Sequence, residues 1–132
     1  MDNPIAVTAV FTAVLAVMQI FLAVYVGIFR TKTDILFLDG GNEELLRRIR
    51  AHGNFTENVP MALLVMAGAE MSGVSTMIIT AVGCVLILAR VIHFAAITKT
   101  GPEIGRAIGA GGTSLAIILM AILIMSKSIG SG

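Results

Sequence analysis

Four polar residues at helical spacing stand out in a chain that is otherwise apolar enough for lipid. Arg47, Arg50, Asn54 and Glu57 follow one another at steps of three, four and three residues, which places them on one stripe of a helix. A helix that carries such residues into a bilayer must direct them into a protein interior or a wet cavity, because ionisable groups that face lipid are costly. This stripe is therefore the first candidate for a functional site.

Arginines outnumber acids around the stripe, which indicates an anionic ligand. The guanidinium group binds carboxylates through paired hydrogen bonds, and a nearby cation favours the thiolate form of a thiol. The set therefore suits an anionic thiol or an anionic lipid head group. The charged and histidine residues expected near the same end of the molecule are Arg30, Arg47, Arg48, Arg50, His52, Glu57, Arg90, His93 and Arg106.

Structural explanations exist for several of these residues. Arg47 and Arg48 can extend to lipid head groups, Arg90 can belong to a structural ion pair, and His93 can be a hydrogen-bonded packing residue. An i, i+7 pair on one helix is too far apart for direct contact. Glu57 therefore needs a partner other than Arg50, from another helix or from a ligand.

The elements that position these residues are predicted to be membrane helices. The chain is 57% hydrophobic and 13% charged, and it contains three uncharged runs, Ile5–Phe29, Met71–Ala89 and Ala107–Ser126. Each run is near the ~20 residues that cross a hydrocarbon core. A fourth span must contain the polar stripe, where hydropathy is weak. We predict an all-α, integral membrane four-helix bundle in a single domain, 1–132, with helices at about 4–29, 43–71, 75–98 and 102–127.

Charge placement predicts the orientation. Only Lys127 of the nine Lys and Arg residues falls on one side of the predicted membrane. The positive-inside rule then places the other, basic side in the cytoplasm and both termini outside it. A net charge of +1 without a basic run gives no indication of nucleic-acid binding, and no His, Cys or carboxylate spacing suits a metal. The single cysteine, Cys84, excludes a disulfide framework within the chain.

Glycines recur along the fourth predicted helix. Gly101, Gly105 and Gly109 are four residues apart, and Gly111 and Gly112 follow. Small residues at this spacing let helices approach closely. Packing within one chain is the simplest interpretation, and contact with another subunit or room for a ligand stays open.

Residues 50–60, Arg-Ala-His-Gly-Asn-Phe-Thr-Glu-Asn-Val-Pro, resemble the helix-2 signature R-A-x-x-N-x-x-E-x-x-P of the MAPEG family (membrane-associated proteins in eicosanoid and glutathione metabolism). Leu45–Arg48, Ala89–His93 and Gly105–Gly109 support the resemblance, which covers nearly the whole chain. It implies a homotrimer of four-helix protomers in a membrane, with a glutathione site between neighbouring subunits near the cytoplasmic face. The compact chain looks most like bacterial members, which implies an inner membrane.

The resemblance also implies roles for residues. Arg50, Asn54 and Glu57 match the family's glutathione-binding residues, and Arg106 matches the arginine that stabilises the thiolate. Arg30 and Arg47 match further family arginines. Arg90 and His93 are placed with them as candidate glutathione contacts. The expected function is a glutathione-dependent transferase or peroxidase that acts on lipophilic electrophiles dissolved among the membrane lipids.

Two departures from the family pattern leave an alternative open. The eicosanoid enzymes have tyrosines where this chain has Asn58 and His93, so contacts made through phenol groups are absent. One branch of the family binds lipid without catalysis, and the alternative is a non-catalytic MAPEG-type binder of lipid or of a partner protein. A small proton-coupled exporter, a third class of similar length, needs a carboxylate in its first helix. Ile5–Phe29 has none.

Overall fold

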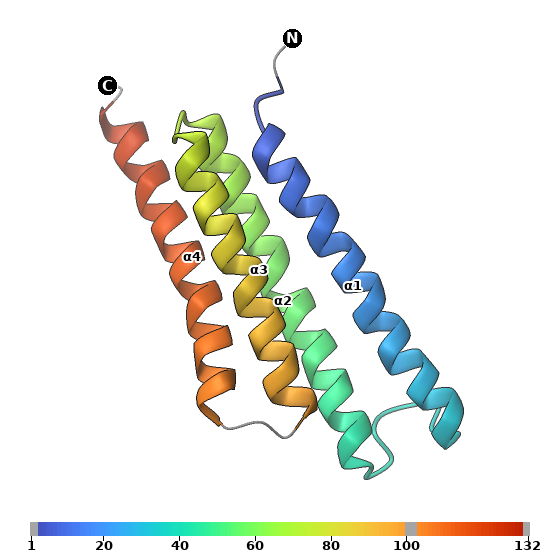
Figure 1. The fold of residues 1–132 in the computed structure, drawn as a ribbon. Helices are drawn as coiled ribbons and strands as arrows, with labels where there is room; N and C mark the ends of the chain where they lie inside the picture. The colour runs from blue at the N-terminus through green and yellow to red at the C-terminus, as the bar shows by residue number, and fades with distance from the viewer. Residues whose placement is uncertain (1–2, 100–102, 131–132) are drawn as a thin grey trace.

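The computed structural model describes residues 3–99 and 103–130, which form four antiparallel helices and no strand. Both termini lie at one end of the bundle, and the α1–α2 loop lies at the other end (Figure 1). The ends of the helices differ from the predicted bounds by up to four residues. The helices are α1 (Ala6–Thr33), α2 (Glu43–Met71), α3 (Thr76–Thr98) and α4 (Glu103–Gly130).

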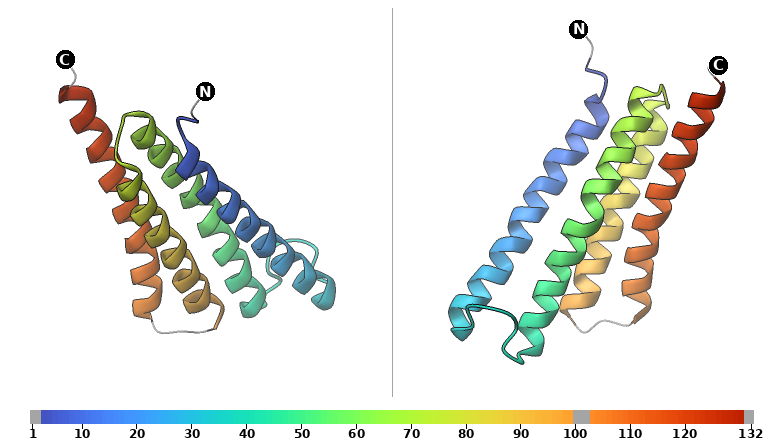
Figure 2. Two further views of the ribbon diagram at one scale, coloured as in Figure 1. Left: turned by 45° about the horizontal axis from the view of Figure 1, so that its top comes forward. Right: turned by 180° about the vertical axis from the view of Figure 1, so that it is seen from behind.

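α2 and α3 form the centre of the bundle. α2 contacts each of the other three helices, whereas α1 contacts α2 and α3 but not α4 over the described residues. The views in Figure 2 show α1 and α4 on opposite sides of the α2–α3 pair. The large side chains that are fully buried between these helices include Leu15, Met66, Leu86 and Met120. The central position of α2 brings the polar motif within reach of side chains from α3 and α4.

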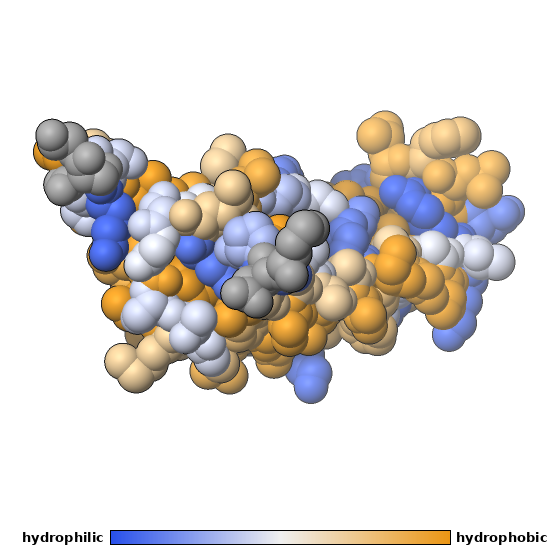
Figure 3. Space-filling model, turned by 90° about the horizontal axis from the view of Figure 1, so that it is seen from above, coloured by the Kyte–Doolittle hydropathy of each residue, from blue (hydrophilic) through white to orange (hydrophobic). Residues whose placement is uncertain are grey.

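Three helices, α1, α3 and α4, are long and apolar enough to cross a membrane. α2 is not among them because its first half carries the charged motif. It nevertheless runs between α1 and α4 in the bundle and contacts each of the other three helices (Figure 2). That α2 also spans the membrane stays a prediction. Apolar residues form much of the outer surface in the view of Figure 3. Exposed large apolar side chains include Val17, Met77 and Leu88, and such a surface suits lipid better than water.

The starts of α2 and α1 are capped in different ways. The Asn42 side chain accepts a hydrogen bond from the Leu45 amide at 3.0 Å and caps α2 from the preceding residue. α1 has no such local cap, because the Asn3 side chain accepts from the Ile5 amide, which precedes the helix. The carboxylate of Glu70 on α2 instead accepts hydrogen bonds from the amides of Val7 and Thr8, both at 2.8 Å. A side chain from another helix therefore accepts hydrogen bonds from the backbone N–H groups at the start of α1, which have no partner within the helix.

The glycines of α4 pack this helix against α3 within one chain. A Cβ on Gly109 would collide with the Cβ of His93 and lie 2.8 Å from the carbonyl oxygen of Ala89. Gly105 and Gly112 meet Ala96 and Ala89 in the same way, at 2.9 and 3.0 Å. Gly111 has nothing within 4 Å, and Gly101 lies outside the described residues. Packing inside the chain therefore accounts for three of the five glycines.

Candidate functional site

The members of the polar motif in the first half of α2 differ in how far they are exposed. Ala51, Phe55 and Val59 are buried and fix the inner face of the helix against its neighbours. Arg50 and Glu57 lie on the exposed side of the helix, and Asn54 is half-buried between the two faces. The periodicity that buries every fourth residue of α2 therefore also turns the two charged members of the motif outward.

Arg90 joins α2, α3 and α4. Its side chain is buried, with a relative exposure of 2%. One terminal nitrogen donates to Asn54 Oδ1 at 2.9 Å, and the other donates to the backbone carbonyl of Gly109 at 2.7 Å. Both acceptors are neutral, and Arg90 forms no ion pair among the described residues. The structural ion pair considered for this residue is therefore wrong, and its charge stays uncompensated within the described part of one chain.

His93 lies one turn after Arg90 and is also buried. Its Nδ1 lies 3.2 Å from the backbone carbonyl of Arg106. Because a carbonyl only accepts, Nδ1 must carry a proton for this contact to be a hydrogen bond, and in the neutral ring Nε2 then has the lone pair. That Nε2 is buried and has no hydrogen-bond partner among the described residues. His93 thus anchors the first turn of α4 and keeps one acceptor unused.

Arg50 and Glu57 have no side-chain hydrogen bond or ion pair with any residue in 3–99 or 103–130. The sequence argument that this i, i+7 pair cannot close on itself agrees with this arrangement. Arg106 is exposed at the start of α4. One chain therefore brings Asn54, Arg90 and His93 together around the α3–α4 contact, and it turns Arg50 and Glu57 away from its own core.

Two candidate arginines have other contacts in the single chain. The Arg30 guanidinium donates to three carbonyls of the α1–α2 loop, those of Ile35, Leu36 and Leu38. Arg47 pairs with Glu43 on its own helix at 3.6 Å. Neither side chain touches Asn54 or Arg90 in the described contacts, so any role at the same site requires a neighbouring subunit or a change of rotamer.

Arg48 binds α1 instead of extending to head groups. Its guanidinium lies 3.9 Å from the ring centre of Tyr25 and 4.1 Å from that of Phe29. It also donates to the Tyr25 carbonyl at 3.2 Å and to the carboxylate of Glu44. Cation–π contacts of this kind attach the start of α2 to the end of α1.

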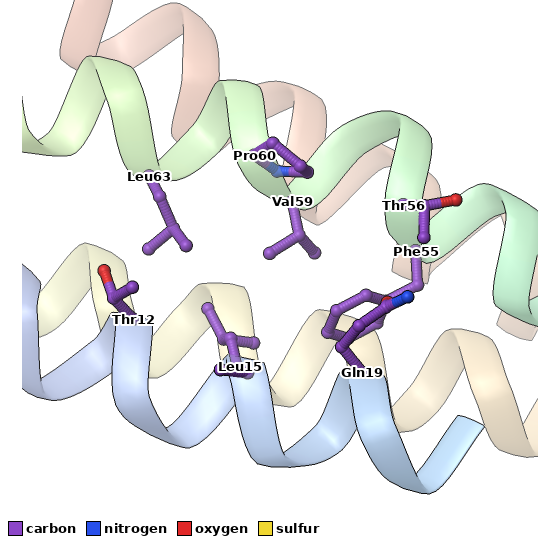
Figure 4. A pocket seen from close by; sticks show the side chains of 9 residues that line it. Thr12, Leu15, Gln19, Phe55, Thr56, Val59, Pro60 and Leu63 are labelled. Carbon is purple, nitrogen blue, oxygen red and sulfur yellow. The ribbon is translucent and has the colours of Figure 1, made fainter. Parts of the chain in front are cut away.

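Sequence reasoning missed a polar pair between α1 and α2. Gln19 Nε2 lies 2.8 Å from His52 Nε2, and Gln19 Oε1 is buried without a partner among the described residues. The Gln19 amide closes one end of an apolar cleft of about 330 Å³ between the two helices (Figure 4). Thr12, Leu15, Val59 and Leu63 line the rest of this α1–α2 cleft. Gln19 is the most polar residue of the uncharged run Ile5–Phe29, and its presence there could have indicated a polar partner on another helix.

Comparison with known proteins gives the family. The MAPEG family model matches residues 8–126. The chain belongs to the MAPEG family. Inner membrane protein YecN of Escherichia coli strain K12 is 32% identical over 88 residues, which are 67% of each chain. Inner membrane protein YecN of Escherichia coli O6:H1 matches to the same extent. This MAPEG protein is accordingly a membrane protein, and its helix-2 signature lies within the matched region.

Proposed function

We propose that this MAPEG protein is a homotrimeric, glutathione-dependent transferase or peroxidase that acts on lipophilic electrophiles in the membrane. The observation that carries the proposal is the pair Arg50 and Glu57, which lie on a helix packed among three apolar ones. The two side chains have opposite charges, are exposed, and have no hydrogen-bond or ion-pair partner among residues 3–99 and 103–130. Charges in that position need a counter-group from another subunit or from a ligand. Glutathione, with two carboxylates, an ammonium group and a thiol, offers both signs.

Each member of the motif has a group of glutathione to bind. The Arg50 guanidinium matches a carboxylate, and the Glu57 carboxylate matches the ammonium group. Arg90 occupies Asn54 Oδ1, which turns the amide so that its two N–H donors stay available for a ligand carboxylate. Arg90 therefore acts as a positioning residue for Asn54 in this scheme.

Arg106 holds the thiol of glutathione as a thiolate. In the transferase reaction the thiolate sulfur attacks an electrophilic carbon, a C–S bond forms, and the leaving group or the opened ring takes the electron pair. In the peroxidase reaction two glutathione molecules are oxidised to the disulfide, while a hydroperoxide is reduced to an alcohol and water. The bilayer concentrates the apolar substrate beside the polar nucleophile, which raises the encounter rate.

The charge distribution supports an orientation. Lys127 lies near the end that carries the termini, and the other described Lys and Arg residues belong to the opposite half of the bundle (Figure 1). We place that basic half on the cytoplasmic side of a bacterial inner membrane, with both termini on the other side. Glutathione would then reach the site from the cytoplasm.

A second candidate function is a non-catalytic lipid binder. The α1–α2 cleft favours it, because its lining is mostly apolar and the Gln19 amide at one end could bind a lipid carbonyl or hydroxyl. This function requires neither Arg106 nor a thiolate. The two candidates therefore differ in their dependence on glutathione.

Glutathione binding to detergent-purified protein, measured by calorimetry and by ultraviolet thiolate absorbance, tests the proposal. We expect Arg50→Ala to abolish binding, and Arg106→Ala to keep binding but lose the thiolate band. Lys127→Ala removes one charge at the opposite end and should change neither signal. If millimolar glutathione neither binds nor forms a thiolate with the wild type, the transferase proposal fails and the lipid binder replaces it.

A further inference from the structure

Three consecutive apolar side chains project from the α1–α2 loop. Leu36, Phe37 and Leu38 have relative exposures of 72%, 84% and 82%. We call these three residues the apolar loop tip. Consecutive apolar residues exposed in a loop are unfavourable in water and point to a surface that is covered in the working protein.

The backbone of the loop is held in a defined conformation that turns its polar groups inward. The Arg30 guanidinium donates to the carbonyls of Ile35, Leu36 and Leu38 at 3.1, 3.3 and 2.8 Å. Leu38 has φ +53°, a left-handed conformation that is uncommon for residues other than glycine. Arg30 therefore binds the carbonyl side of the loop, while the apolar side chains stay outside.

The far side of the loop has its own polar contacts. Asp39 Oδ1 accepts from the Gly41 amide at 3.0 Å, and the Asp39 carbonyl accepts from the Asn42 amide at 2.8 Å. Gly40 has φ +56°, and a Cβ there would come within 3.2 Å of the Ile35 side chain. Backbone groups that are already hydrogen-bonded can enter a medium poor in water at lower cost.

The position of the loop indicates what covers the tip. It directly follows α1, a candidate membrane span, so it lies where the chain leaves the hydrocarbon region. It also lies on the side of the bundle away from α4 (Figures 1 and 2). Lys32 in the last turn of α1 is exposed and can reach head groups, but Asp34 and Asp39 balance the local charge. The attraction therefore depends on apolar burial more than on charge.

We infer that the apolar loop tip inserts into the boundary between head groups and acyl chains of the adjacent lipid leaflet. It would act as an interfacial anchor for the α1–α2 hairpin at the basic end of the bundle. The competing occupants are water and a neighbouring protein surface, and the test separates all three.

The sequence contains no tryptophan, so an introduced tryptophan can report on the loop without a tryptophan background. Phe37→Trp gives a single tryptophan at the tip of the loop, where the replaced side chain is 84% exposed, and excitation at the red edge of the absorption band avoids the tyrosine. The protein is reconstituted into vesicles of dioleoyl phosphatidylcholine, with and without lipid brominated in the acyl chains. Acrylamide serves as the aqueous quencher. Leu88→Trp on the exposed side of α3 serves as the reference inside the hydrocarbon, and N-acetyltryptophanamide as the reference in water.

We expect Phe37→Trp to emit at a shorter wavelength than N-acetyltryptophanamide does in water. Brominated lipid should quench this emission, but less than it quenches that of Leu88→Trp. Acrylamide should quench it less than it quenches the water reference. Leu36→Trp should give the same three results. It serves as a second probe if Phe37→Trp disturbs the fold. Adding Leu36→Ser and Leu38→Ser to Phe37→Trp should reduce quenching by brominated lipid.

Two results would overturn the inference. Full quenching by acrylamide without quenching by brominated lipid would place the tip in water. Protection from both quenchers would place it against protein, in a second copy of the chain or in a folded-back loop. Neither result depends on glutathione binding, so the test of the anchor is independent of the test of the proposed function.

Discussion

Arg90 on α3 donates a hydrogen bond to Asn54 Oδ1 on α2 at 2.9 Å, and this contact ties the polar motif to the centre of the bundle. The second terminal nitrogen of Arg90 binds the carbonyl of Gly109 on α4. One buried side chain thereby sets both the orientation of a predicted ligand contact and the α3–α4 packing. Buried polar groups of this kind are costly to leave unsatisfied, so their removal has measurable consequences.

Arg90→Ala should destabilise the protein by about 2–4 kcal/mol, because the buried Gly109 carbonyl and the half-buried Asn54 amide lose their donor and a cavity replaces the side chain. Thermal or SDS unfolding in detergent measures this loss. Arg47→Ala, which removes an arginine from a partly exposed i, i+4 pair, should cost less than about 0.5 kcal/mol. Equal effects of the two substitutions would contradict the central role of Arg90.

Gly109→Ala should separate α3 from α4 and cost about 1–3 kcal/mol, because the new Cβ meets the backbone and Cβ of neighbouring residues that cannot move away easily. Gly111→Ala is the matched control on the same helix. Its Cβ meets nothing within 4 Å, so it should leave stability unchanged or raise it by up to about 1 kcal/mol through helix propensity. The same unfolding assay compares the two variants. A loss of stability in Gly111→Ala would show that another surface covers this face of α4.

Glu70→Ala should loosen the start of α1. The substitution leaves the Val7 and Thr8 amides and the Thr8 hydroxyl without their acceptor, at a cost of about 1–2 kcal/mol. Faster amide exchange confined to the first turn of α1 is the specific readout. Glu57→Ala removes a carboxylate from the same helix that has no partner in the described residues. It should leave this exchange unchanged while weakening glutathione binding.

Gln19 and His52 should show energetic coupling. His52→Leu alone leaves the Gln19 amide without its hydrogen-bond partner and should cost about 1–2 kcal/mol. His52→Leu combined with Gln19→Leu removes both polar groups and should cost less than the sum of the single changes. A double-mutant cycle measures the difference, and strict additivity would mean that the 2.8 Å contact contributes nothing.

Much of the architecture followed from local pattern. Uncharged runs near the length of a bilayer core predicted helices that the structure contains, and the predicted bounds 43–71 of the second helix agree with those of α2. The spacing of the motif placed Arg50 and Glu57 on one side of α2, and family membership was readable from residues 50–60. These inferences succeed because helical periodicity, caps and spans depend on residues within a few positions of each other.

Only the tertiary structure decided which polar groups meet. Arg90 finds Asn54 36 residues away, Glu70 caps a helix 62 residues earlier, Arg48 rests on Tyr25, and Arg30 turns to its own loop. Each of these side chains had several partners or a head group available within its reach. The choice depends on how far apart the helices lie, how they cross and which rotamers the neighbours leave open. Helical spacing along a single segment contains no information about those distances, and so the sequence determined the elements and the motif while packing determined the contacts.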